Sequence, residues 1–171
     1  IFKDGRQLTP AEGEKLHSCG KLRFETFRRI LRSRGLNLDN MAAGSVGALV
    51  RRAEPVWDVA NFFARVPEAT RNSTSSLVSM EDVMIAMAEE LITTTNPEGA
   101  WMTGACQGAK LFDGKTCNRD GLACLVGATP SDRQIDLCNN MVSDTAAGVS
   151  DELTRKRFAI TAIADVAFLC D

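Results

Sequence analysis

The chain has 171 residues, a net charge of −2, and 44% hydrophobic and 25% charged residues. This length supports one domain with a substantial core, and the composition excludes wholesale disorder. There is no tyrosine and aromatic residues make up only 6% of the chain, which argues against an aromatic binding platform. We therefore predict a single helical domain over 1–171.

Charge and cysteine are divided unevenly along the chain. Residues 1–71 contain 13 Lys and Arg against 8 Asp and Glu, a net charge of +5, whereas residues 72–171 contain 7 against 14, a net charge of −7. All cysteines but Cys19 lie in the second part. This asymmetry predicts a soft division near 67–78 between a basic first part and an acidic, Cys-rich second part, which face each other or meet different partners.

Helix signals dominate the basic part. A cap, a proline and a glutamate over 9–12 predict a first helix, and the apolar face of 21–34 predicts a second that ends before Gly35. The stretch 45–66 has apolar residues at helical spacing with Pro55 in its middle. It predicts a kinked helix or two shorter helices.

Three more helices are predicted in the acidic part. The first begins with Ser79 as its cap, the second with Thr129 and Pro130 and runs to about Ser143, and the third begins at Ser150. The apolar stripe of the first of these helices comprises Met80, Val83, Met84, Met87, Ala88 and Leu91. A methionine row is typical of core filling more often than of a binding groove or a soft metal site, so we predict a buried face.

The segment 96–128 has no helical or strand period and is rich in glycine. A loop of this length needs something to hold it, and its cysteines do so if they form disulfides. The disulfide candidates are Cys19, Cys106, Cys117, Cys124, Cys138 and Cys170. Several connectivities are open, and we favour Cys19 with Cys170 only by elimination. The predicted fold is all-α: an irregular bundle of six or seven helices with one long Gly/Cys-rich, disulfide-stapled loop (about 96–128).

Disulfides imply an oxidising compartment, so we predict an extracytoplasmic protein that is secreted, periplasmic or at the cell surface. Free cysteines in a reducing cytosol are the alternative. The triplet Asn72–Thr74 is a glycosylation sequon, which matters only in a eukaryotic secretory pathway. No transmembrane segment is predicted, since the longest apolar-rich stretch, 158–170, is too short to span a bilayer and contains Asp165.

Signals for catalysis, metals and cofactors are weak. The sequence contains no GxSxG, Walker or HExxH motif and no CxxC pair. His17 and Cys19 are two residues apart and point to nearly opposite sides of a helix, so they do not form a local nucleophile and base dyad. We assign no catalytic, metal or cofactor-binding residue, and an enzyme is the less favoured reading.

A basic helix face is the clearest binding candidate. Lys21, Arg28, Arg29 and Arg32 recur opposite an apolar stripe and form a face for an anionic partner, such as an anionic surface contacted peripherally. A solvated face is the simpler interpretation, because Glu25 interrupts the row. Nucleic acid is not expected as a partner, because the pI is near 5.5 and no binding motif is present.

These observations favour a non-catalytic extracytoplasmic binding or structural module, a component of a larger cell-surface or secreted assembly. Its partner would be another protein or a second copy of the chain, contacted through the Gly/Cys-rich segment, because long loops on a rigid scaffold tend to carry recognition. The alternatives are a small extracytoplasmic hydrolase-like enzyme that uses carboxylates in a cleft, and a helical carrier of an apolar ligand. Convergent acids with perturbed pKa values would favour the enzyme, and an enclosed apolar cavity would favour the carrier.

Overall fold

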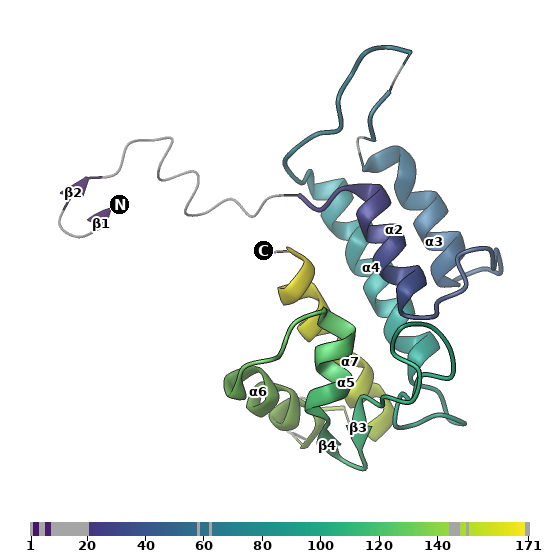
Figure 1. The fold of residues 1–171 in the computed structure, drawn as a ribbon, viewed down its shortest axis with the longest axis vertical. Coiled ribbons are helices and arrows are strands. Elements are labelled where there is room, and N and C mark those ends of the chain that lie inside the picture. The colour runs from purple at the N-terminus through teal and green to yellow at the C-terminus, as the bar shows by residue number, and fades with distance from the viewer. Residues whose placement is uncertain are drawn as a thin grey trace.

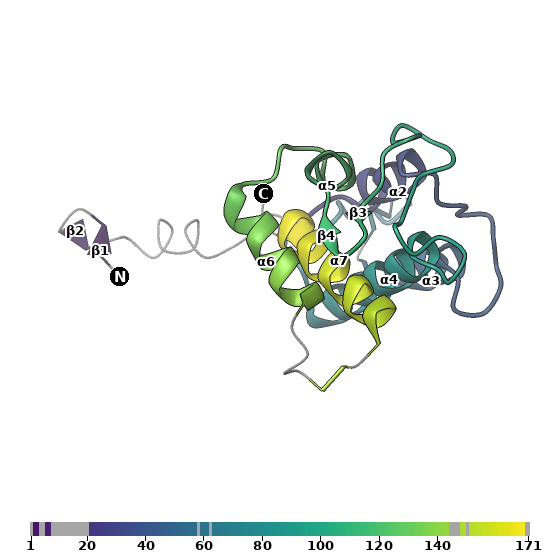
Figure 2. The same cartoon turned by 90° about the horizontal axis from the view of Figure 1, so that it is seen from below.

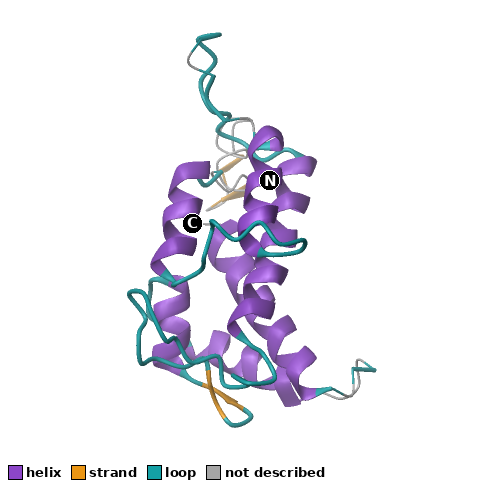
Figure 3. Ribbon diagram, turned by 90° about the vertical axis from the view of Figure 1, so that its right-hand side faces the viewer, coloured by secondary structure: helices purple, strands orange, loops and turns teal. Residues whose placement is uncertain are grey.

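The computed structural model describes residues 2–3, 6–7, 21–57, 59–61, 63–143, 148–149 and 151–169. The α-helices of this part are α2 (Phe24–Ser33), α3 (Val46–Ala53), α4 (Thr74–Leu91), α5 (Arg119–Val126), α6 (Asp132–Ser143) and α7 (Glu152–Leu169), and a 3₁₀ turn, η1 (Glu54–Val56), follows α3. Two antiparallel hairpins pair β1 (Phe2–Lys3) with β2 (Arg6–Gln7) and β3 (Phe112–Asp113) with β4 (Thr116–Cys117). The fold is mostly helical, as predicted, and the short hairpins make all-α an approximation (Figure 3).

Helices α4 and α7 form the centre of the bundle. Helix α4 packs against α3 on one side and against α7 on the other, and α5 and α6 pack on α7 (Figures 1 and 2). The start of α7 lies beside the end of α4, where Arg157 Nε donates to Ile92 O at 2.9 Å. The predicted methionine stripe is confirmed, since all six of its members are buried in the core. Buried side chains from α2, α3 and the later helices share this core.

Trp57 joins α2 to the end of η1. Its buried ring stacks on Phe27 with 5.0 Å between ring centroids and contacts Phe24 at 5.4 Å. Its Nε1 donates to Leu22 O at 3.1 Å. The indole therefore fills the apolar space beside α2 and still satisfies its only polar group.

The prediction of continued helix over 45–66 is wrong beyond Val56. Pro55 lies in η1, where its ring and missing N–H end the α-helical hydrogen bonding. The chain then turns back on itself through two backbone hydrogen bonds between Asn61 and Val66. Residues 59–61 and 63–69 therefore form a loop that projects beyond the ends of the helices (Figure 1).

Helix α4 begins before the predicted cap. Ser73, not Ser79, is its N-cap, and the Ser73 hydroxyl accepts from the Ser76 N–H at 3.1 Å. Hydrogen bonding by Ser73 satisfies a backbone donor that would otherwise have no partner, so the helix starts inside the polar connector. Asn72 of the glycosylation sequon is therefore the residue before the cap.

The caps of α6 and α7 also differ from the prediction. Ser131, not Thr129, caps α6 through a reciprocal pair in which Gln134 N donates to the serine hydroxyl at 3.3 Å and Ser131 N donates to Gln134 Oε1 at 2.8 Å. Asp151 caps α7 by accepting from Thr154 N at 2.8 Å. Ser150, predicted to open this last helix, lies outside the described residues.

Several other predictions also fall outside the described residues. These are the helix near 9–20, His17 with Cys19, and the Cys19–Cys170 pair. In the part of the chain that the structure does describe, no helix combines the length and apolar character needed to cross a bilayer.

Candidate functional site

Residues 96–118, called here the stapled loop, connect α4 to α5. The predicted irregular segment extended to 128, and this was wrong, because residues 119–126 form α5. The Asn118 side chain caps this helix by accepting from Gly121 N at 2.9 Å. The glycine-rich sequence therefore does contain helix signals: Asn118 as the N-cap, and Gly127, at φ 86°, as the residue that ends the helix.

Two disulfides hold the stapled loop, as predicted for its cysteines. Cys106 is bonded to Cys124 of α5, with 5.7 Å between the Cα atoms. Cys117 is bonded to Cys138 of α6, with 6.2 Å between the Cα atoms. The two links interleave along the sequence, so they tie the loop to two helices at once. Formed disulfides indicate an oxidising environment.

Hydrogen bonds fix the first turn of the stapled loop. Asn96 Nδ2 donates to Leu91 O at 3.1 Å and to Ala100 O at 2.9 Å, and Asn96 Oδ1 accepts from Ala100 N at 2.9 Å. Further along, Trp101 and Ala109 are joined through a backbone hydrogen bond of 2.9 Å. Trp101, Leu111 and Phe112 are buried in the core. The loop is thus anchored from inside as well as by sulfur.

Charged groups brace the hairpin at the base of the loop. Lys110 Nζ lies 3.1 Å from both Glu98 Oε2 and Asp113 Oδ1. The hydrogen bond from Lys110 lowers the pKa of Glu98, and the hydrogen bond from Asn118 lowers the pKa of Asp113. Both acids are therefore ionised at neutral pH, and these solvent-exposed contacts position the hairpin more than they stabilise the fold.

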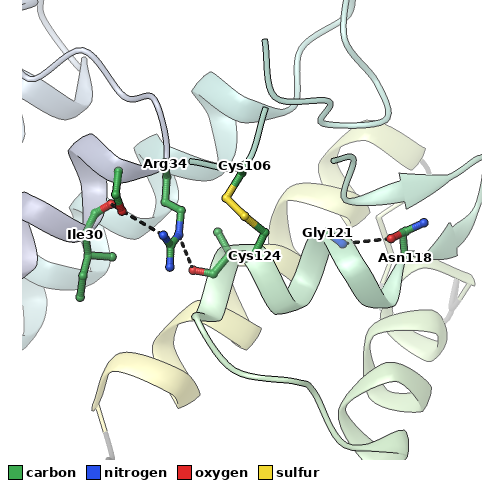
Figure 4. Close-up of a disulfide and its surroundings, with 8 residues drawn as sticks. Ile30, Arg34, Cys106, Asn118, Gly121 and Cys124 are labelled. Atoms are coloured by element: carbon green, nitrogen blue, oxygen red, sulfur yellow. Dashed lines mark hydrogen bonds between the residues drawn. A yellow bond between two sulfur atoms is a disulfide. The ribbon is translucent and has the colours of Figure 1, made fainter. Parts of the chain in front are cut away.

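Helix α2 supports the other side of the loop. Arg34 Nε donates to Leu125 O at 2.9 Å, close to the Cys106–Cys124 disulfide (Figure 4). Ala105 N donates to Ser33 O at 2.9 Å. Gly104 permits this approach, because its φ is 85° and a Cβ there would lie 2.9 Å from Ser33 O. What remains exposed is the tip, residues 102–105 and 107–108, where the Met102 side chain is 77% exposed.

The residues of the predicted anionic-partner face do not form one surface, because they make different contacts. The Lys21 ammonium donates to Trp57 O and lies 3.9 Å from Glu68 Oε1, and this side chain is only 1% exposed. Arg28 and Arg29 both pair with Glu25 at 3.3 Å. Arg32 is exposed near the end of α2. The structure therefore groups Arg28 and Arg29 around an acid and places Lys21 inside the fold.

An apolar pocket lies between α4, α6 and α7, and sequence reasoning did not identify it. Its volume is about 420 Å³ and its walls are mostly apolar. The apolar side chains that line it include Ile85, Met141, Phe158 and Ala162. Helices α6 and α7, which contribute Met141 and Phe158 to the lining, lie side by side (Figure 2). This is the size of a small-molecule site.

Two acids line the same pocket. Burial raises the pKa of Asp165 to about 6, and the nearby Glu81 carboxylate adds to the rise. Asp165 Oδ1 is buried and has no hydrogen-bond partner among the described residues. Arg155 also lines the pocket, where Nε donates to Val142 O at 2.7 Å and Nη1 to Val149 O at 2.8 Å. Arg155 therefore ties the end of α6 to α7.

We expect Asp165→Asn to stabilise the protein at pH 7.5. The raised pKa means that the folded state keeps a proton that the unfolded state releases above about pH 4, so the free energy of unfolding falls as the pH rises from about 4 to about 6. The neutral amide removes this loss, and solvent screening of a half-buried group limits the gain to about 1 kcal/mol. Thermal melts at pH 7.5 and pH 4 measure the difference.

The gain should be present at pH 7.5 and absent near pH 4. Glu81 on α4 and Arg155 on α7 are the other charged groups that line the pocket, and both are unchanged in this variant. An Asp165→Asn protein that melts below the wild type at pH 7.5 would contradict the expectation.

No protein-family model, no curated protein and no solved structure matches this chain. The stapled loop and the apolar pocket are the structural features that bear on its function.

Proposed function

We propose that the protein is a non-catalytic extracytoplasmic binding or structural module, and that the tip of the stapled loop contacts a protein partner. The observation that carries the proposal is the contrast within this loop. Its base is held by two disulfides and buried side chains, whereas residues 102–105 and 107–108 are exposed. A surface that is already ordered loses little conformational entropy on binding, so it binds more tightly for the same contacts.

The composition of the tip supports a protein partner. Met102 is an exposed, flexible apolar side chain that can fill an irregular pocket on another surface. Its neighbours, from Thr103 to Ala105 with Gln107 and Gly108, are small or uncharged. The disulfides support placement outside the cytoplasm, as a secreted, periplasmic or cell-surface protein. In this proposal the partner belongs to the same surface or secreted assembly.

Site-specific photocrosslinking in the cells that make the protein tests this proposal. A photoreactive side chain at position 102 should give a crosslinked species of defined mass, whether the partner is another protein or a second copy. The matched control places the same group at position 136, which is exposed on α6 away from the tip. Equal crosslinking from both positions, or none from position 102, would count against the tip as the contact surface.

The pocket supports a second candidate function, the helical carrier of a small ligand. Its mostly apolar walls and its volume of about 420 Å³ suit a small molecule, although the pocket is open on one side, where Ile85 and Phe158 are exposed. The two acids are also what a carboxylate-based hydrolase would need. The apolar walls favour binding over hydrolysis, because an ordered attacking water needs several polar partners.

A further inference from the structure

The α4–α6–α7 pocket combines mostly apolar walls with two carboxylates, those of Glu81 and Asp165. Apolar side chains such as Ile85, Phe158 and Met141 form the walls beside Asp165, whose carboxyl is half-buried. A half-buried carboxylate among apolar side chains loses part of its hydration, and a bound group that donates to the side of the carboxylate lining the pocket compensates for that loss. Such a pocket fits a ligand with an apolar body and one donor group.

The charged groups that line the pocket indicate that this donor group is a cation. Glu81 lines the same pocket as Asp165. Its negative charge repels that of Asp165 and adds to the rise that burial causes in the pKa of Asp165. The Arg155 guanidinium donates to the carbonyls of Val142 and Val149 and so holds these two parts of the backbone together beside the pocket. A cation placed between the two acids would relieve their repulsion, whereas a carboxylate or phosphate would add to it.

We infer that the pocket binds a small amphipathic amine, whose ammonium group lies against Asp165 and Glu81 and whose apolar body lies between Ile85, Phe158 and Met141. This inference rests on the second candidate function, that the pocket is a ligand site. The exposed ring of Phe158 adds a surface on which an ammonium or an aromatic body can rest. A neutral apolar molecule would fit the walls but would donate no hydrogen bond to either carboxylate that lines the pocket.

Three probes of nearly the same shape test the inference: 4-phenylbutylamine, 4-phenylbutanol and 4-phenylbutyrate. Binding of each to the intact, oxidised protein is measured at pH 7.5 by titration calorimetry and by chemical-shift changes. We expect the amine to bind at least about tenfold more tightly than the alcohol, and the carboxylate to bind more weakly than either.

Two isosteric variants assign the preference to the acids. In Asp165→Asn, the affinity for the amine should fall to that for the alcohol. In Glu81→Gln, the preference for the amine over the alcohol should be reduced in part. The matched control is Asp82→Asn, which removes an exposed charge from the next position of α4, outside the pocket, and should leave the preference intact. Circular dichroism confirms that each variant is folded; if Asp165→Asn is not, Glu81→Gln carries the test.

The outcomes separate this inference from the function on which it rests. Equal binding of amine and alcohol would overturn the amine inference and keep the apolar carrier. No binding of any probe at millimolar concentration would overturn both. Ile85→Trp, at the exposed rim, should weaken amine and alcohol alike if they occupy this pocket; an unchanged affinity would place the probes elsewhere and overturn the inference.

Discussion

Replacing Gly121 by alanine should destabilise the protein by about 3 kcal/mol, although alanine is the better helix former. Gly121 lies on the buried face of α5, where the helix backbone meets the stapled loop. A Cβ at this position would lie 1.9 Å from Lys110 O and 2.9 Å from Leu111 Cα. These are backbone atoms of a segment fixed by hydrogen bonds and disulfides, so they cannot rotate away as a side chain would.

Urea unfolding followed by circular dichroism measures this effect. The matched control is Gly114→Ala in the turn between β3 and β4, where a Cβ would meet nothing within 4 Å but φ is 63°. We expect that control to lose only about 1 kcal/mol, from backbone strain. If Gly121→Ala is as stable as the wild type, α5 and the stapled loop are packed less closely than these distances require.

Removing the Cys117–Cys138 disulfide should have a comparable effect. The link closes a segment in which the two cysteines are 21 residues apart, and the loss of such a constraint on the unfolded chain costs about 3 kcal/mol. Both cysteines are buried, so we choose the double variant Cys117→Ala with Cys138→Ala, which leaves neither a lone thiol nor a buried hydroxyl. The free energy of unfolding is measured in urea under non-reducing conditions.

Limited trypsin digestion tests where the loosening occurs. Cleavage after Lys115, which lies in the hairpin turn, should become much faster in the double variant, while the far-UV circular dichroism of the helices changes little. The matched control removes the other link by Cys106→Ala with Cys124→Ala, which should expose the tip of the loop more than the hairpin. Unchanged cleavage at Lys115 in the first variant would show that the disulfide does not hold this part of the loop.

The photocrosslinking, amine-binding and Asp165→Asn experiments address different properties. The first tests the tip of the stapled loop as a contact surface, and the second tests the pocket as a ligand site. The third measures the cost of keeping an acid in that pocket, whatever binds there. A stabilising Asp165→Asn change that also abolishes amine preference would indicate that the acid is retained for binding at the expense of stability.

The sequence by itself determined the helical character, the buried methionine stripe of α4 and the role of the cysteines. These depend on local signals: the spacing of apolar residues repeats with the helical period, and a long glycine-rich segment without such a period needs crosslinks. It also placed the second helix and the stop before Gly35 close to where they are observed. The start of α4 was predicted wrongly, at Ser79 instead of Ser73, because a serine can cap a helix at either position and only packing selects between them.

Only the tertiary structure decided which cysteines pair, because the connectivity depends on which helices lie beside the loop. It also decided which charged side chains are buried. Lys21 belongs to a basic pattern in the sequence, but its ammonium group contacts Trp57 O and Glu68 and lies inside the fold. The pocket had no sequence signal, because Glu81 and Asp165 lie on helices far apart in the chain. Their proximity, and the raised pKa of Asp165, exist only when α4 and α7 pack together and bury part of the Asp165 carboxyl.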